Sequence, residues 1–172
     1  MKDIYVKFVG ASELEGDSTD DKHKNEIEVS SFRHRVFQPK SSSASTAGSH
    51  TAERTEHGEM LFTKDIDRAT SKLLRACSAG TIYPKVEITF YRAYGGKSAT
   101  STSQTRIDYY KIVLEDVVIS SVDTVIDGGE LPAENFGLKY GKIVWEYKQH
   151  KHDGSATSTG KAGWDLRKNI AA

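Results

Sequence analysis

Apolar and polar residues alternate along several stretches of the chain. The alternation is clearest at 4–8 and 86–90, and it recurs at 110–114, 117–125 and 59–62. Because successive side chains of a β-strand point to opposite faces of a sheet, this pattern predicts strands with one buried face. About seven or eight strands of this kind indicate a mainly β fold built from antiparallel strands.

The alternation changes phase early in the chain. Ile27 and Val29 alternate with glutamates, whereas Phe32 and Val36 fall out of phase with them. A β-bulge adds one residue to a strand and moves the following side chains to the other face. We therefore predict a long, kinked strand with its bend near residues 30–31.

A second change of phase separates residues 136–140 from residues 143–147. Gly141 lies at the change. A bend costs least at a residue without a Cβ, so we predict that the strand bends or bulges at this glycine.

One segment has helical rather than alternating spacing. Thr70 or Ser71 can cap its N-terminus, and Gly80 follows as a left-handed stop. Free cysteine behaves mostly as a small hydrophobe, so the cysteine in this segment is interpreted as a core thiol rather than a nucleophile. The apolar stripe consists of Ile66, Ala69, Leu73, Ala76 and Cys77.

Three low-complexity runs, at 40–49, 95–105 and 153–163, are predicted as turns or loops. The first belongs to an extended loop at about 38–51, and the last to a polar C-terminal tail at about 149–172. Loops of about twelve residues are uncommon in compact β domains unless they serve a function. Contact with another molecule is the predicted role of the first loop, and an ordinary flexible loop is the alternative.

Composition narrows the class of protein. The chain has 172 residues, which suits one domain spanning 1–172 without disulfides, and its 24 basic residues balance 24 acidic ones. A balanced charge supplies no field for a phosphate backbone, so no nucleic-acid partner is expected. The apolar runs are too short for a membrane span or a secretory signal peptide, which predicts a soluble protein made in the cytoplasm.

The sequence contains no recognisable catalytic constellation. Residues 154–162 resemble a phosphate-binding loop, but five residues separate the glycines where four are required, and Ala162 replaces the hydroxyl that would bind Mg²⁺. His150 and His152 could face one side of a strand, which leaves a metal- or small-ligand-binding barrel as the alternative function. Solvated surface histidines are the simpler interpretation, so we expect no enzyme activity, metal or cofactor.

Short motifs along nearly the whole chain resemble the Hcp family (haemolysin-coregulated protein), which forms the inner tube of the bacterial type VI secretion system. Their order and spacing make a chance match hard to reach. The matching segments are 3–8, 23–24, 26–32, 38–41, 51–54, 62–67, 71–73, 91–93, 118–122, 136–140, 143–147 and 163–166.

This resemblance implies a single-domain β-barrel with one short α-helix that assembles as a ring. Family members close into hexameric rings, and the rings stack into a tube that is fired by a contractile sheath. The implied partners are further copies of the chain, the spike protein, the sheath and secreted effectors. Export would proceed through the type VI system without a signal peptide.

The resemblance also suggests where assembly takes place. The lumen-facing part of the kinked strand would carry Arg33 and Arg35, although these two arginines could instead pair with carboxylates on the barrel surface. Trp164 is interpreted as an anchor that docks the C-terminus onto the barrel rather than as a binding residue. The residues expected to reach a neighbouring ring are Gln38, Lys40, Ser42, Ser45, Ser49, His50 and Thr51.

Overall fold

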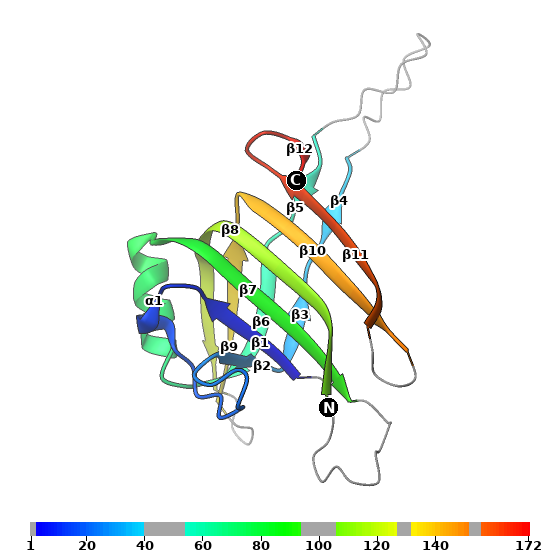
Figure 1. The fold of residues 1–172 in the computed structure, drawn as a ribbon. Coiled ribbons are helices and arrows are strands. Elements are labelled where there is room, and N and C mark those ends of the chain that lie inside the picture. Colours follow the sequence, from blue (N-terminus) through cyan, green and yellow to red (C-terminus); the bar gives the residue numbers. More distant parts are fainter. Residues whose placement is uncertain (1–2, 40–53, 94–105, 127–131, 152–155) are drawn as a thin grey trace, which may run out of the picture.

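The alternating segments form one antiparallel sheet that bends around a hydrophobic core (Figure 1). The structure is a computed structural model, and it describes residues 3–39, 54–93, 106–126, 132–151 and 156–172. The first half of the described chain contains β1 (Asp3–Phe8), η1 (Ser12–Leu14), β2 (Ile27–Val29), β3 (Ser31–Arg33), β4 (Val36–Phe37), β5 (Glu56–His57), β6 (Met60–Asp65) and α1 (Thr70–Ala79). The second half contains β7 (Ile82–Ala93), β8 (Arg106–Val125), β9 (Ala133–Lys139), β10 (Lys142–His150), β11 (Ala156–Asp165) and β12 (Ile170–Ala171).

Hydrogen-bonded ladders follow one another around a barrel. β1 pairs with β2 and β7, β7 with β8, β8 with β9, β9 with β6, and β6 with β3. β2 and β3 are consecutive parts of one kinked strand, and Ser30 at the kink donates its N–H to the carbonyl oxygen of Thr63 at 2.8 Å. The predicted bend near residues 30–31 is confirmed, and it carries the chain from the ladder with β1 to the ladder with β6.

β8 pairs first with β10 and then with β9, and together these strands form a long antiparallel ribbon. Val118 is paired with Lys139, and Glu115 is paired with Lys142, so β9 and β10 continue in one register along β8. The ribbon is interrupted at Gly141, whose N–H donates to the carbonyl oxygen of Glu115 at 3.0 Å. The predicted bend at this glycine is confirmed, and β10, β11 and β12 extend the sheet beyond it.

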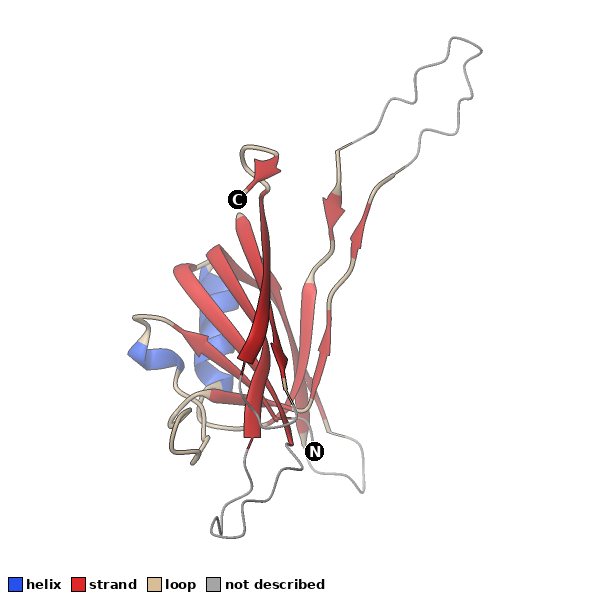
Figure 2. Cartoon of the chain, turned by 45° about the vertical axis from the view of Figure 1, so that its right-hand side comes forward, coloured by secondary structure: helices blue, strands red, loops and turns tan. Residues whose placement is uncertain are grey.

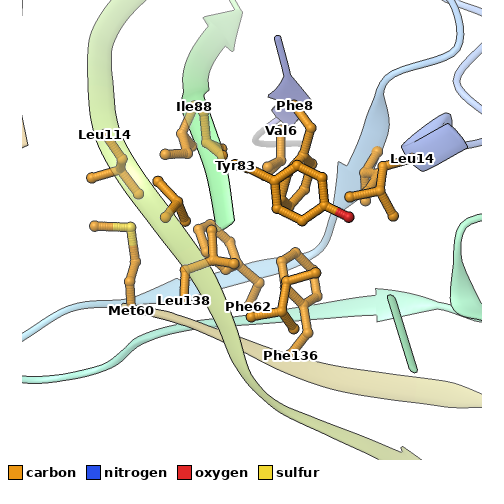
Figure 3. Close-up of a cluster of buried hydrophobic side chains, with 14 of the residues drawn as sticks. Val6, Phe8, Leu14, Met60, Phe62, Tyr83, Ile88, Leu114, Phe136 and Leu138 are labelled. Carbon is orange, nitrogen blue, oxygen red and sulfur yellow. The ribbon is translucent and has the colours of Figure 1, made fainter. Parts of the chain in front are cut away.

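Because the sheet bends back toward itself, apolar side chains from its opposite walls meet in the core (Figure 3). Phe62 of β6 stacks on Phe136 of β9 with ring centroids 4.9 Å apart, and Phe8 meets Tyr83 edge to face. α1 covers the barrel on the side away from β11 (Figure 1). The labelled core residues are Val6, Phe8, Leu14, Met60, Phe62, Tyr83, Ile88, Leu114, Phe136 and Leu138.

The helix begins differently from the prediction. Neither Thr70 nor Ser71 caps it, because the residue before the first turn is Ala69. Instead the Asp67 carboxylate accepts the Ala69 N–H at 2.8 Å, and the Thr70 hydroxyl accepts the Asp67 N–H at 3.1 Å. The predicted stop is confirmed at Gly80, which has a left-handed φ of 62°.

The C-terminal segment also differs from the prediction. Residues 156–163 do not form a loop, because β11 pairs with β10 along its length, from Lys142 opposite Asp165 to His150 opposite Ala156. A complete backbone ladder outweighs the low strand preference of a serine- and glycine-rich sequence. Trp164 lies in this strand and packs against the core, as expected of an anchor.

A lysine and a glutamate are buried together beneath α1. Lys64 of β6 and Glu134 of β9 are paired in the ladder, both side chains are fully buried, and Nζ lies 2.7 Å from Oε1. Nζ also lies 2.7 Å from the Asp67 carboxylate. Burial removes the hydration of these charges, so each charged group is stable only while its partner of opposite charge stays in place.

Replacing Lys64 by methionine should therefore lower the free energy of unfolding by about 3–5 kcal/mol, because Glu134 would remain buried without its partner. Urea unfolding measures this loss. The double variant Lys64→Met, Glu134→Leu should recover most of it. Equal losses in the single and double variants would contradict this account.

Candidate assembly arm

Two chain segments leave the end of the barrel together (Figure 2). They form a separate two-stranded sheet in which Val36 of β4 pairs with His57 and Phe37 pairs with Glu56 of β5. We call the described part, residues 34–39 and 54–58, the arm. It lies beyond β3 and β6 and leads into the predicted extended loop.

The arm is held together past its last strand pair. The Thr55 hydroxyl donates to the Gln38 side-chain oxygen at 2.5 Å. At the other end of the arm, the Gly58 N–H donates to the Arg35 carbonyl oxygen at 2.8 Å. Val36 remains 44% exposed, so the arm presents an apolar side chain that its own barrel does not cover.

A tyrosine hydroxyl connects both segments of the arm to the barrel. The Tyr140 hydroxyl lies 2.7 Å from Nε2 of His34 and 2.9 Å from Nδ1 of His57. Trp145 of β10 packs nearby, with its ring centroid 6.1 Å from that of His57. We call His34, His57 and Tyr140 the latch.

Burial sets the protonation of the latch. It lowers the pKa of His34 from 6.5 to about 4, with a further contribution from the neighbouring His57. Burial also lowers the pKa of His57 and raises that of Tyr140. At neutral pH both imidazoles and the phenol are therefore uncharged.

The two arginines of the kinked strand are exposed. Arg33 lies on the outward face of β3 and is paired in register with Leu61, and the guanidinium of Arg35 lies 4.6 Å from the centre of the Phe37 ring. Neither arginine forms an ion pair with a carboxylate among the residues that the structure describes. Their positions therefore do not favour the alternative of pairing on the barrel surface.

Polar side chains cover the outward face beside Arg33. The Ser31 hydroxyl donates to the Thr63 hydroxyl at 2.9 Å, which in turn donates to the Asn135 side-chain oxygen at 2.7 Å. This row crosses β3, β6 and β9. The face combines small, neutral hydrogen-bonding groups with a free positive charge.

Of the residues predicted to reach a neighbouring ring, Gln38 lies in the described arm and is exposed. The other six fall outside the described residues: Lys40, Ser42, Ser45, Ser49, His50 and Thr51. The latch was not predicted, because nothing in the sequence connects Tyr140 to two histidines far from it along the chain.

The alternative metal site receives little support from the geometry. Nδ1 of His150 lies 3.1 Å from the Lys148 carbonyl oxygen, and His152 is outside the described residues. Within the described ranges, no group of three or more histidine, cysteine, aspartate or glutamate side chains could hold a metal ion. The helices in those ranges are too short or too polar to cross a membrane.

Comparison with known proteins agrees with this architecture. Residues 5–147 match the family model described as "Type VI secretion system effector, Hcp". Protein hcp1 of Pseudomonas aeruginosa is 32% identical over 167 residues, covering 96% of this chain and 97% of that protein. The "Major exported protein" of the same organism is 29% identical over 147 residues, covering 81% of this chain and 79% of that protein. A solved type six secretion system protein superposes with a TM-score of 0.83 at 26% identity, covering both chains completely.

A mainly antiparallel barrel with one helix and a paired arm is thus the fold of a type VI secretion component. The chain belongs to the Hcp family. Proteins of this family are secreted structural components of the tube and are not known as enzymes.

Removing the latch hydroxyl tests how the arm is attached. Tyr140→Phe should lower the free energy of unfolding by about 1–2 kcal/mol, because two half-buried imidazoles lose their shared partner. Thermal unfolding at neutral pH provides the measurement. Tyr147→Phe is the matched control, because Tyr147 is 46% exposed, and its stability should stay unchanged. Equal effects of the two substitutions would argue against the latch.

Proposed function

We propose that this chain forms hexameric rings that stack into the inner tube of a type VI secretion system. The observation that carries the proposal is the arm, which extends a paired segment and an exposed Val36 beyond the barrel. An exposed apolar side chain on a protruding element is typical of a surface that another molecule covers. Because the chain belongs to the Hcp family, we infer that the assembly it forms is a tube of stacked rings.

Stacking requires two unlike ends that fit each other. The arm carries exposed Arg35 and Arg54. A cleft of about 780 Å³ is lined by five carboxylates, of which three already pair with Arg106, Arg68 and Lys64 and two have no such partner among the described residues. The start of β1 and the end of β6, which contribute to its lining, lie at the end of the barrel away from the arm (Figure 1). A contact between unlike ends repeats in one direction without closing, as a tube needs. The carboxylates are those of Asp3, Asp17, Glu28, Asp65 and Asp67.

The proposed partners follow from this assembly. Copies of the chain form the rings, and the spike protein and the contractile sheath would contact the ends and the outside of the tube. Secreted effectors would travel inside it. The chain would leave the cytoplasm through the type VI system, which agrees with the exported relative named above.

Static light scattering of the purified protein should give a particle of six times the 19.0 kDa chain mass. Electron microscopy should show stacked rings. Joining Pro39 to Arg54 through two glycines should abolish the stacks and leave the rings, because it removes most of the predicted extended loop that is expected to contact the neighbouring ring. Shortening the serine-rich segment at 95–105 in the same way is the control, and it should leave the stacks intact. A monomer at all concentrations would overturn the proposal.

The outward face beside Arg33 is the proposed lumen surface. Six copies of this arginine per ring would favour effectors with acidic surfaces, because complementary charges stabilise the encounter. Arg33→Glu should reduce co-purification of an acidic effector by roughly tenfold or more at low salt. Arg75→Glu is the control, because Arg75 is an exposed arginine on α1 rather than on this face, and recovery should stay unchanged. Unchanged recovery with Arg33→Glu would show that this face does not line the lumen.

A further inference from the structure

The latch is the point at which the arm is tied to its barrel. His34 precedes β4 and His57 lies in β5, so each segment of the arm contributes one imidazole. Tyr140 lies at the interruption between β9 and β10, so its position is set by the barrel. One hydroxyl group thus holds both segments of the arm.

This arrangement depends on uncharged imidazoles. The single proton of the Tyr140 hydroxyl is donated to one imidazole nitrogen, and its oxygen accepts the N–H of the other imidazole. When both imidazoles are protonated, each ring nitrogen is a donor and the tyrosine proton has no acceptor. The two positive rings would also repel each other, because their centroids are only 6.1 Å apart.

The surrounding charges do not compensate a positive latch. Glu59, at the start of the neighbouring strand, accepts hydrogen bonds from the Ser120 and Ser121 hydroxyls instead. On β10, the Lys142 ammonium lies 3.0 Å from the Glu115 carboxylate, and the residue that meets His57 is the uncharged Trp145.

Charges on the arm itself do not neutralise the imidazoles either. The Arg35 guanidinium lies over the Phe37 ring, and Glu56 is exposed. Among the described residues, neither His34 nor His57 forms an ion pair. Protonation would therefore leave uncompensated positive charge at the base of the arm.

We propose that the latch is an acid-sensitive switch that holds the arm in its stacking position at neutral pH and releases it when His34 and His57 are protonated. The proposal rests on the proposed stacking function of the arm and adds its regulation. Histidine is the side chain best suited to this task, because small changes in its surroundings shift its charge within the physiological range.

The direction of the pH effect follows from the folded-state values. The pKa of His34 lies at about 4 in the latch, below its ordinary value of 6.5. A released arm therefore binds more protons than a latched arm between these two values. Attachment of the arm is fully present above about pH 6.5 and weakens as the pH falls toward 4. Tubes should shorten into rings over the same range, while the barrel remains folded.

Trp145 reports on the latch directly, because its indole lies beside His57 while the arm is attached and becomes exposed to water when the arm leaves. In a Trp164→Phe background, where Trp145 is the remaining tryptophan, its emission should shift to longer wavelength as the pH is lowered from about 7.5 to 4. The stacks should shorten in parallel, as measured by light scattering. Far-ultraviolet circular dichroism should stay constant, which shows that the barrel has not unfolded.

Two sets of variants make the test specific. In His34→Gln, His57→Gln the emission change should disappear and the stacks should persist in acid, whereas His150→Gln should behave like the parent. If the double variant fails to fold, Tyr140→Phe serves instead, and its transition should move toward pH 6.5 because the bridge is missing. A transition that persists in the double variant, or constant Trp145 emission in the parent, would overturn the switch.

The outcomes separate the switch from the proposed function. An emission change with stacks of unchanged length would overturn the regulatory role of the latch while leaving the tube intact. Absence of stacks at pH 7.5 would instead overturn the stacking function, and the fluorescence titration would still decide whether the latch releases the arm.

Discussion

The interruption of the long ribbon at Asp116 is the constraint on which the rest of the fold depends. Asp116 has a left-handed φ of 52°, and it lies opposite Pro84, which has no N–H to offer a ladder. The Gly141 N–H completes the bend by donating to the carbonyl oxygens of Glu115 and Asp116, and Arg167 forms an ion pair with the Asp116 carboxylate. The two halves of β8 therefore lie in different walls of the barrel. Tyr140 lies beside the bend, where its hydroxyl contacts the arm.

Local patterns in the sequence predicted much of this fold, because they arise from neighbouring residues. The alternation identified the strands, and the phase changes identified the bends at Ser30 and Gly141. The β11 strand was missed because its stability comes from pairing with β10 rather than from its own residues. Lys64 shares the buried face with Phe62, so its position follows the alternation, but its partner Glu134 is distant in the sequence and could not be identified.

Some features of the candidate functional site could likewise be expected from the sequence, and others could not. An extended loop at about 38–51 was expected from composition and from resemblance to the family, and a lumen-facing Arg33 from the resemblance. Most of the loop lies outside the described residues, and Arg33 is exposed. The latch could not be predicted, because it needs three segments to meet at one hydroxyl group. The balanced charge argued against a nucleic-acid partner, and the scattered polar groups argued against a catalytic site. Neither pattern indicated self-assembly, which was expected only from the resemblance to the family.

The small sheet of β4 and β5 is separate from the sheet of the barrel. Residues that share no ladder and little core with the rest of a protein can open without global unfolding. The arm is therefore an independent unit of stability, joined to the barrel mainly through His34, His57 and Tyr140. Its length and sequence are free to change between related proteins without cost to the core, so one barrel can be fitted to different neighbours.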